Sequence, residues 1–289
     1  MRSEKEMMNH FESIVKNDAG IRLSVLEGSR TNQNVPKDDF QDYDISFFVT
    51  DITSYKKNDD WLNIFGDIVF MQKPENMELF PAELENWFSY IMYFNDGIKI
   101  DLSLIPIDEV NQYFSDADGL VEILVDKDNR INQEIIPSDF KYWTKKPNEQ
   151  EFDDCCNEFW NVSAYVAKGL FRKELLFALD HFNQILRPEL LRMMSWEVGL
   201  RKGFNFSVGK NYKFIDKHLP EKEFDKLTKT FSLAGYKEAL ESFELCCQMF
   251  RTYSKKVASA LGYKYPEYDQ KITGFIHNVY EKMSERSEK

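Results

Sequence analysis

The change in hydrophobic periodicity near residue 145 constrains the fold of this 289-residue chain more than any other feature. Before that point, short alternating runs indicate strands: "SVLEGS", "YDISFFV", "DIVFMQ", "WFSYIMYF" and "GIKIDLSLI". Three segments between or before them are expected to be helices: "MMNHFESIVKND", "DITSYKKNDDWLNIFG" and "IDEVNQYFSD". After residue 145, apolar residues recur every three or four positions, for example Phe159, Val162 and Val166. The pattern predicts an α+β fold: a mixed β-sheet flanked by helices over residues 1–145, and an all-helical bundle over residues 146–289.

Charge is distributed unevenly between these two parts. Residues 1–150 hold 29 acids and 15 bases, a net charge of −14, whereas residues 151–289 hold 20 acids and 22 bases. An acidic surface excludes a broad polyanionic partner such as nucleic acid, but it favours a metal ion or a cationic small molecule. The slightly basic second part suits a compact anion such as a nucleoside triphosphate. The sequence shows no signal peptide and no apolar run long enough to span a membrane, so we expect a soluble cytoplasmic protein with no membrane partner. We further expect a monomer or a weak homodimer.

Two aspartates lie on a predicted strand, where acids are uncommon. Because residues i and i+2 of a strand face the same side, Asp42 and Asp44 share one face, and Asp101 is a lone acid on the polar face of a later strand. Clustered carboxylates raise one another's pKa and cost stability unless a cation neutralises them. Mg²⁺ prefers oxygen ligands, and three such acids can build a two-metal site for phosphoryl transfer. The alternative is that the acids only line a solvated face of the sheet.

Gly28 and Ser29 directly follow the first predicted strand. A glycine lets backbone amides approach a phosphate closely, and a serine hydroxyl can donate a further hydrogen bond. The pair alone is a weak signal, and the chain has neither a P-loop motif nor a GxGxxG motif.

The order of these features resembles the polymerase-β-like nucleotidyltransferase superfamily: a strand, Gly28-Ser29, a spacer, Asp42-x-Asp44 on a strand, then Asp101 on a later strand. Further stretches resemble the aminoglycoside 6-adenylyltransferases over roughly residues 5–285. They are "LEGSRTN", "DYDISFFVTD", "IKIDLSLIP", "SVGKNYKFIDKHLP" and the long helical segment that begins "FWNVSAYVAKGLFRKELLFALDHF".

This resemblance implies an enzyme that transfers AMP from ATP to the 6-hydroxyl of the streptidine ring of streptomycin, with release of pyrophosphate and resistance to the drug. It implies that Asp42 and Asp44 hold Mg²⁺, with two ions expected, and that Gly28 and Ser29 contact the β- and γ-phosphates. Asp101 would be the third carboxylate, serving as a general base beside the acceptor, a metal ligand, or both.

Other residues are candidates in the context of that family, each with a structural alternative. Those for the nucleotide are Arg30, Lys168, Lys210 and Tyr212, which could instead form ion pairs or a solvated basic face. Those for the cationic drug, besides Asp101, are Trp160, Asp180, Trp196 and Glu197, since indole rings and carboxylates bind guanidinium groups. Buried tryptophans and surface acids are the alternatives.

Two rival functions stay open at this point. A nucleotidyltransferase of the same superfamily could act on another aminoglycoside or on a protein hydroxyl, which substrate competition would reveal. A non-catalytic nucleotide-binding module is a rival of another class, and the presence of all three aspartates argues against it.

Overall fold

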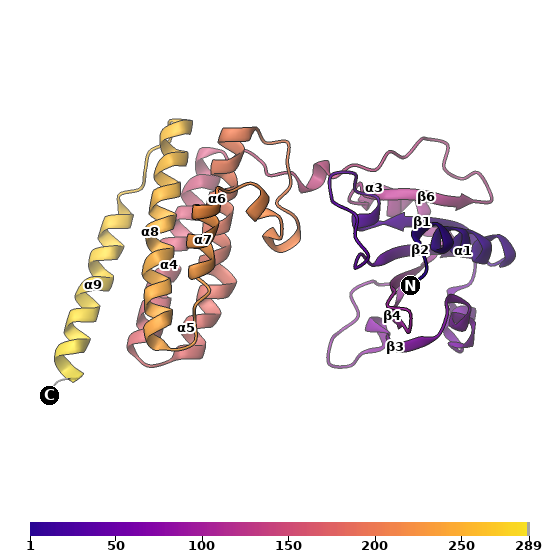
Figure 1. The fold of residues 1–289 in the computed structure, drawn as a ribbon, viewed down its shortest axis with the longest axis horizontal. Helices are drawn as coiled ribbons and strands as arrows, with labels where there is room; N and C mark the ends of the chain where they lie inside the picture. Colours follow the sequence, from indigo (N-terminus) through magenta and orange to yellow (C-terminus); the bar gives the residue numbers. More distant parts are fainter. Residues whose placement is uncertain (288–289) are drawn as a thin grey trace. The chain divides into compact units, whose positions relative to one another are not determined.

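The structure is a computed structural model that describes residues 1–287. The chain divides into two compact units, Met1–Lys141 and Tyr142–Lys289, with a sheet in the first and a group of helices in the second (Figure 1). The predicted α+β fold is confirmed. The boundary between the units along the chain falls between residues 141 and 142, whereas the hydrophobic pattern of the sequence changes near residue 145. Among residues 1–287, no helix is long and apolar enough to cross a membrane.

One mixed sheet of six strands forms the first unit, in the order β3-β4-β5-β2-β1-β6. β2 and β5 run parallel, while the other neighbouring pairs are antiparallel. Five of the strands were expected from alternation, and β6, an edge strand with two acids, was not. The strands are β1 (Ile21–Glu27), β2 (Tyr43–Val49), β3 (Ile68–Gln72), β4 (Phe88–Phe94), β5 (Lys99–Pro106) and β6 (Val121–Asp126).

Helices cover both faces of this sheet. On one face, α1 (Glu4–Asn17) begins at a capping box formed by Ser3 and Glu6 and buries its apolar side. The core beneath it contains the residues that alternation assigned to the apolar faces of β2 and β5: Tyr43, Ile45, Phe47, Ile98, Ile100, Leu102 and Leu104. On the other face, α3 (Val110–Asp116) packs on a smaller core. Alternation therefore places Asp44 and Asp101 on the α3 side.

One predicted helix of the first unit is broken. The segment "DITSYKKNDDWLNIFG" forms α2 (Ile52–Lys56), then a turn, then a 3₁₀ helix over Asp60–Phe65. Asn58 and Asp59 lie at the break, where their side chains compete with helical hydrogen bonding.

Helices make up the second unit. Pro188 lies in the first turn of α6 and Gly203 at its end, as predicted, and a π-helical turn over Phe182–Leu186 precedes it. The helices are α4 (Glu149–Phe171), α5 (Leu175–His181), α6 (Arg187–Lys202), α7 (Glu221–Lys229), α8 (Tyr236–Leu261) and α9 (Tyr268–Ser287).

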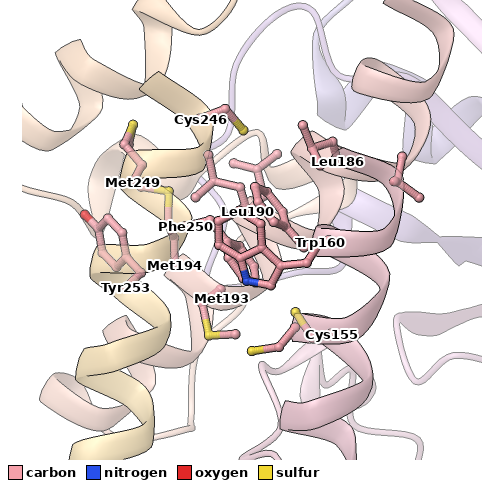
Figure 2. Packing of buried hydrophobic residues seen from close by; sticks show 14 of the residues in the cluster. Cys155, Trp160, Leu186, Leu190, Met193, Met194, Cys246, Met249, Phe250 and Tyr253 are labelled. Carbon is pink, nitrogen blue, oxygen red and sulfur yellow. The ribbon is translucent and has the colours of Figure 1, made fainter. Parts of the chain in front are cut away.

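Aromatic stacking joins α4 to α8 in the core of this unit. The ring of Phe159 stacks on that of Phe250 with centroids 3.7 Å apart, and the Trp160 ring meets Phe159 edge-on at 5.0 Å. Figure 2 shows Trp160 among Leu190, Met193 and Met194 of α6 and residues of α8. Such a packed interior leaves its side chains little freedom.

Candidate active site

Three acidic side chains form a row across β1, β2 and β5. Asp44 lies opposite Asp101 in the parallel pairing of β2 with β5, and Glu27 lies opposite Asp44 in the antiparallel pairing of β1 with β2. Because opposite residues point to the same face of a sheet, the three carboxylates share one surface. They line a cleft of about 260 Å³ together with Gly28, Ser46 and Ser103. The sheet thus brings together two acids that are far apart in the sequence.

Asp42 joins this row through a lysine. It stands just before β2, and its Oδ2 accepts a hydrogen bond of 2.6 Å from Lys99 Nζ. The same ammonium donates to Asp101 Oδ2 at 2.8 Å. Burial works against the charged form of Lys99, but its bonds to Asp101 and Asp42 outweigh burial and raise its pKa. One cation therefore holds two of the three predicted carboxylates.

Asp44 is costly to ionise where it lies in the row. Burial, followed by repulsion from Asp101, Asp42 and Glu27, raises the pKa of Asp44 to about 6, and attraction to Lys99 offsets only part of this. Burial also raises the pKa of Glu27, whose carboxylate accepts a hydrogen bond from Ser46. A carboxylate that is this costly to ionise is typical of a site that receives a cation.

Gly28 is required at the rim of the cleft for two reasons. Its φ of +70° is left-handed, and a Cβ atom there would lie 2.5 Å from Asp44 Oδ2. Its amide donates to the carbonyl of Leu120 at 2.9 Å, so this amide is not free for a phosphate. The next two amides, of Ser29 and Arg30, open a 3₁₀ helix over Gly28–Arg30 and have no partner within that helix. These amides suit the predicted phosphate contact better than that of Gly28.

Arg30 is buried, with 9 % of its surface exposed. Its guanidinium donates to the carbonyls of Gln41 at 2.6 Å and Asp42 at 2.9 Å, and it lies 3.7 Å from the centroid of the Tyr43 ring. These contacts fix the chain where it enters β2 and so position Asp42. A direct contact of Arg30 with the nucleotide stays a prediction that this arrangement does not favour.

The donor set fits a divalent cation in its chemistry. All three aspartates offer oxygen, the ligand that Mg²⁺ prefers. Within the described chain, Asp101 Oδ1 is buried and has no hydrogen-bond partner. In the same part of the chain, no three His, Cys, Asp or Glu side chains are arranged to hold a metal ion. The ligands are thus present on one face, but they are not spaced as a metal would space them.

Comparison with known proteins identifies the family of this chain. The sequence model described as "Streptomycin adenylyltransferase" matches residues 1–279. The chain belongs to the streptomycin adenylyltransferase family. It is similar to proteins named "Aminoglycoside 6-adenylyltransferase" from Staphylococcus aureus and Bacillus subtilis. The Staphylococcus aureus protein is 57 % identical over 97 % of this chain and 100 % of its own length. The Bacillus subtilis protein is 58 % identical over 97 % of this chain and 99 % of its own length. The predicted resemblance is confirmed.

A solved structure gives a further likeness. The crystal structure of an aminoglycoside 6-adenyltransferase from Bacillus subtilis is 52 % identical in sequence and covers 97 % of this chain and 99 % of its own, with a TM-score of 0.49.

The other nucleotide candidates of this family member lie in the second unit. Lys168 is exposed in the last turn of α4, and its Nζ lies 5.6 Å from the ring centroid of Phe275. Lys210 is exposed in the 3₁₀ turn Lys210–Tyr212 that follows Gly209. Tyr212 has a left-handed φ of +60° and is partly buried against the helical core. The roles of these residues stay predictions.

Two of the four drug candidates in the second unit belong to its core. Trp160 is 2 % exposed and Trp196 is 8 % exposed, and both pack in the helical interior (Figure 2 shows Trp160). This burial does not favour a direct drug contact, since either ring would have to leave the core to make one, and the drug-binding role of both residues stays a prediction. Glu197 binds Arg201 through both carboxylate oxygens at 2.8 and 2.9 Å, and Asp180 is exposed near the end of α5.

Lys99, Glu27 and Asp118, which also lines the cleft, are among the site residues that sequence reasoning missed. Lys99 was placed on the polar face of the same strand as Asp101, two residues away, and this spacing was the signal that the two could interact. Glu27 directly precedes Gly28, but only the pairing of β1 with β2 shows that it lies opposite Asp44.

Proposed function

We propose that the chain transfers the adenylyl group of ATP to the 6-hydroxyl of the streptidine ring of streptomycin, releases pyrophosphate and so confers resistance. Family membership makes the chain an aminoglycoside adenylyltransferase; the acceptor, the donor and the metal are the proposal. The observation that supports it best is the pairing of Asp44 with Asp101 beside the Gly28 turn. That arrangement offers carboxylates and amides to the two ends of a triphosphate.

The proposed reaction is an in-line displacement at the α-phosphorus. The acceptor oxygen forms a bond to this phosphorus, while the bond to the oxygen that bridges to the β-phosphate breaks and pyrophosphate leaves with the electron pair. The hydroxyl proton passes to Asp101. Its Oδ2 is engaged by Lys99, but its Oδ1 is buried in the described chain without a hydrogen-bond partner and can accept this proton.

Three aspartates would hold the proposed Mg²⁺ ions: Asp42, Asp44 and Asp101. When bound, the metal neutralises charge on the triphosphate and on the departing pyrophosphate. The chain itself contributes the placement of these ligands. The β-ladder fixes Asp44 and Asp101, and the contacts of Arg30 with the carbonyls of Gln41 and Asp42 fix the entry to β2. Ser29 and the amides that open the 3₁₀ helix would bind the far phosphates.

Charge supports a cationic acceptor. The first part of the chain has a net charge of −14, and streptomycin carries guanidinium groups. The acids near the cleft would attract such an acceptor over a distance set by the ionic strength.

A turnover assay tests the proposal. Purified protein with ATP, Mg²⁺ and streptomycin should release pyrophosphate and add the mass of AMP to the drug, and the reaction should stop without Mg²⁺. Other aminoglycosides and a hydroxyl-bearing protein serve as alternative acceptors. Turnover of one of these in place of streptomycin would refute the acceptor, and pyrophosphate release without Mg²⁺ would refute the metal.

A further inference from the structure

Lys99 occupies the space between two of the proposed metal ligands. Its ammonium is 2.6 Å from Asp42 Oδ2 and 2.8 Å from Asp101 Oδ2, and its side chain is 20 % exposed. The two aspartate side chains are 39 % and 33 % exposed, so the bridge lies at the mouth of the site, where solvent screens it only in part.

An ammonium at this place and a metal ion on the same oxygens exclude each other. Mg²⁺ binds carboxylate oxygen at about 2.0–2.1 Å, so a metal held by Asp42 and Asp101 would come close to Lys99 Nζ. Two cations at such a distance repel strongly in a partly buried cleft.

The bridge takes in Asp42 and Asp101 but not Asp44. Lys99 bonds to Asp42 and Asp101, whereas Asp44 lies between Asp101 and Glu27 in the strand pairing. The ammonium therefore neutralises part of the charge of the site, but not all of it. A ligand that brings both a divalent cation and phosphate oxygens would satisfy all these groups, since the phosphates can accept the displaced ammonium.

We propose that Lys99 is a displaceable internal counter-ion that holds Asp42 and Asp101 before substrate arrives and competes with free metal for them. Metal then binds well only together with a nucleotide, whose phosphate oxygens receive the Lys99 ammonium. The part of this inference that concerns the nucleotide rests on the proposed function. The competition with metal does not, because it depends only on the three side chains.

Metal binding in the absence of nucleotide tests the competition. Mn²⁺ affinity of the full-length protein is measured by electron paramagnetic resonance or calorimetry for the wild type, Lys99→Met and Lys99→Gln. Both variants should bind Mn²⁺ on the order of tenfold more tightly, equivalent to about 1.4 kcal/mol. Lys73→Met is the matched control: Lys73 also pairs with an aspartate, Asp59, at similar exposure but outside the cleft, and its loss should leave the Mn²⁺ affinity unchanged.

The nucleotide-dependent part has its own readout. With a non-hydrolysable ATP analogue present, wild-type Mn²⁺ affinity should rise, and the advantage of Lys99→Met should shrink because the wild type regains a contact between Lys99 and phosphate. Unchanged or weaker Mn²⁺ binding by folded Lys99→Met or Lys99→Gln would overturn the competition. The glutamine variant decides the matter should the methionine variant unfold. The metal-binding measurements use no acceptor, so they can be interpreted even if the protein does not turn over streptomycin.

Discussion

Replacement of Gly28 by alanine should separate the catalytic importance of this turn from its importance for stability. An alanine Cβ would lie 2.5 Å from Asp44 Oδ2, so the carboxylate must move by about 0.9 Å to restore an ordinary contact of 3.4 Å. A misplacement of about 1 Å in an active site can cost on the order of 100-fold in rate. We therefore expect kcat/KM to fall about 100-fold in Gly28→Ala.

The loss of stability should be modest by comparison. The clash involves the tip of a side chain that can rotate, so the main cost is the left-handed φ of +70°, which amounts to about 1–2 kcal/mol for a residue with a Cβ. For a chain of this size, each kcal/mol lowers Tm by roughly 2–4 °C. Thermal melting and steady-state pyrophosphate release on the same preparation measure the two effects.

Gly262 provides a matched control. Its φ of +73° is nearly the same, but a Cβ atom there would meet nothing within 4 Å. Gly262→Ala should thus lose a similar free energy of unfolding and keep its kcat/KM. The reasoning fails if Gly28→Ala retains wild-type kcat/KM, or if Gly262→Ala loses as much activity as Gly28→Ala does.

Three further predictions follow from contacts of single residues. Asp44→Asn should abolish turnover and should also make the free energy of unfolding less dependent on pH. Because the pKa of Asp44 is raised in the folded chain, its protonated form stabilises that chain fully below about pH 4, and this stability is lost as the pH rises through about 6. Urea melts between pH 4 and 7 should therefore be flatter in the variant, and an identical pH slope would contradict the assignment. Arg30→Met loses two hydrogen bonds to backbone carbonyls and should lower the free energy of unfolding by about 1–3 kcal/mol. It should also reduce kcat, because Asp42 is then less well positioned. A change in the KM for ATP alone would instead indicate that Arg30 contacts the nucleotide. Trp160→Ala should lower the free energy of unfolding by about 3–5 kcal/mol and leave the KM for streptomycin unchanged in the folded fraction. A raised KM with normal stability would support the drug-binding role of Trp160.

The core of the site was predictable from strand alternation. Alternation alone assigns Tyr43, Ile45 and Phe47 to the buried face of β2, and the structure packs all three beneath α1. The same rule places Asp44 and Asp101 away from that core. What alternation cannot supply is the neighbour of each strand, because pairing depends on contacts between segments far apart in sequence. The parallel pairing of β2 with β5 is what makes Asp44 and Asp101 neighbours.

Two of the predicted contacts are not favoured by the structure, each for a specific reason. Trp160 resembled a drug contact because indole rings bind guanidinium groups, but a large apolar ring at a helical core position is buried first by packing. Arg30 resembled a phosphate ligand because it follows Ser29, yet the fold turns its guanidinium to the carbonyls of Gln41 and Asp42. Residue type and spacing indicate what a side chain can bind, whereas its direction depends on the local turn.

The acidic row itself explains why a cation should be drawn to this place. Burial and repulsion raise the pKa of Asp44, and burial raises that of Glu27, so the folded chain loses stability by keeping these groups ionised. A ligand that binds only the folded chain and neutralises the row recovers that free energy as affinity. Lys99 recovers part of it within the chain, because its charge, held between Asp42 and Asp101, also attracts the Asp44 carboxylate. The remainder is available to a cation that reaches Asp44, so affinity for that cation should increase as Asp44 loses its proton near pH 6.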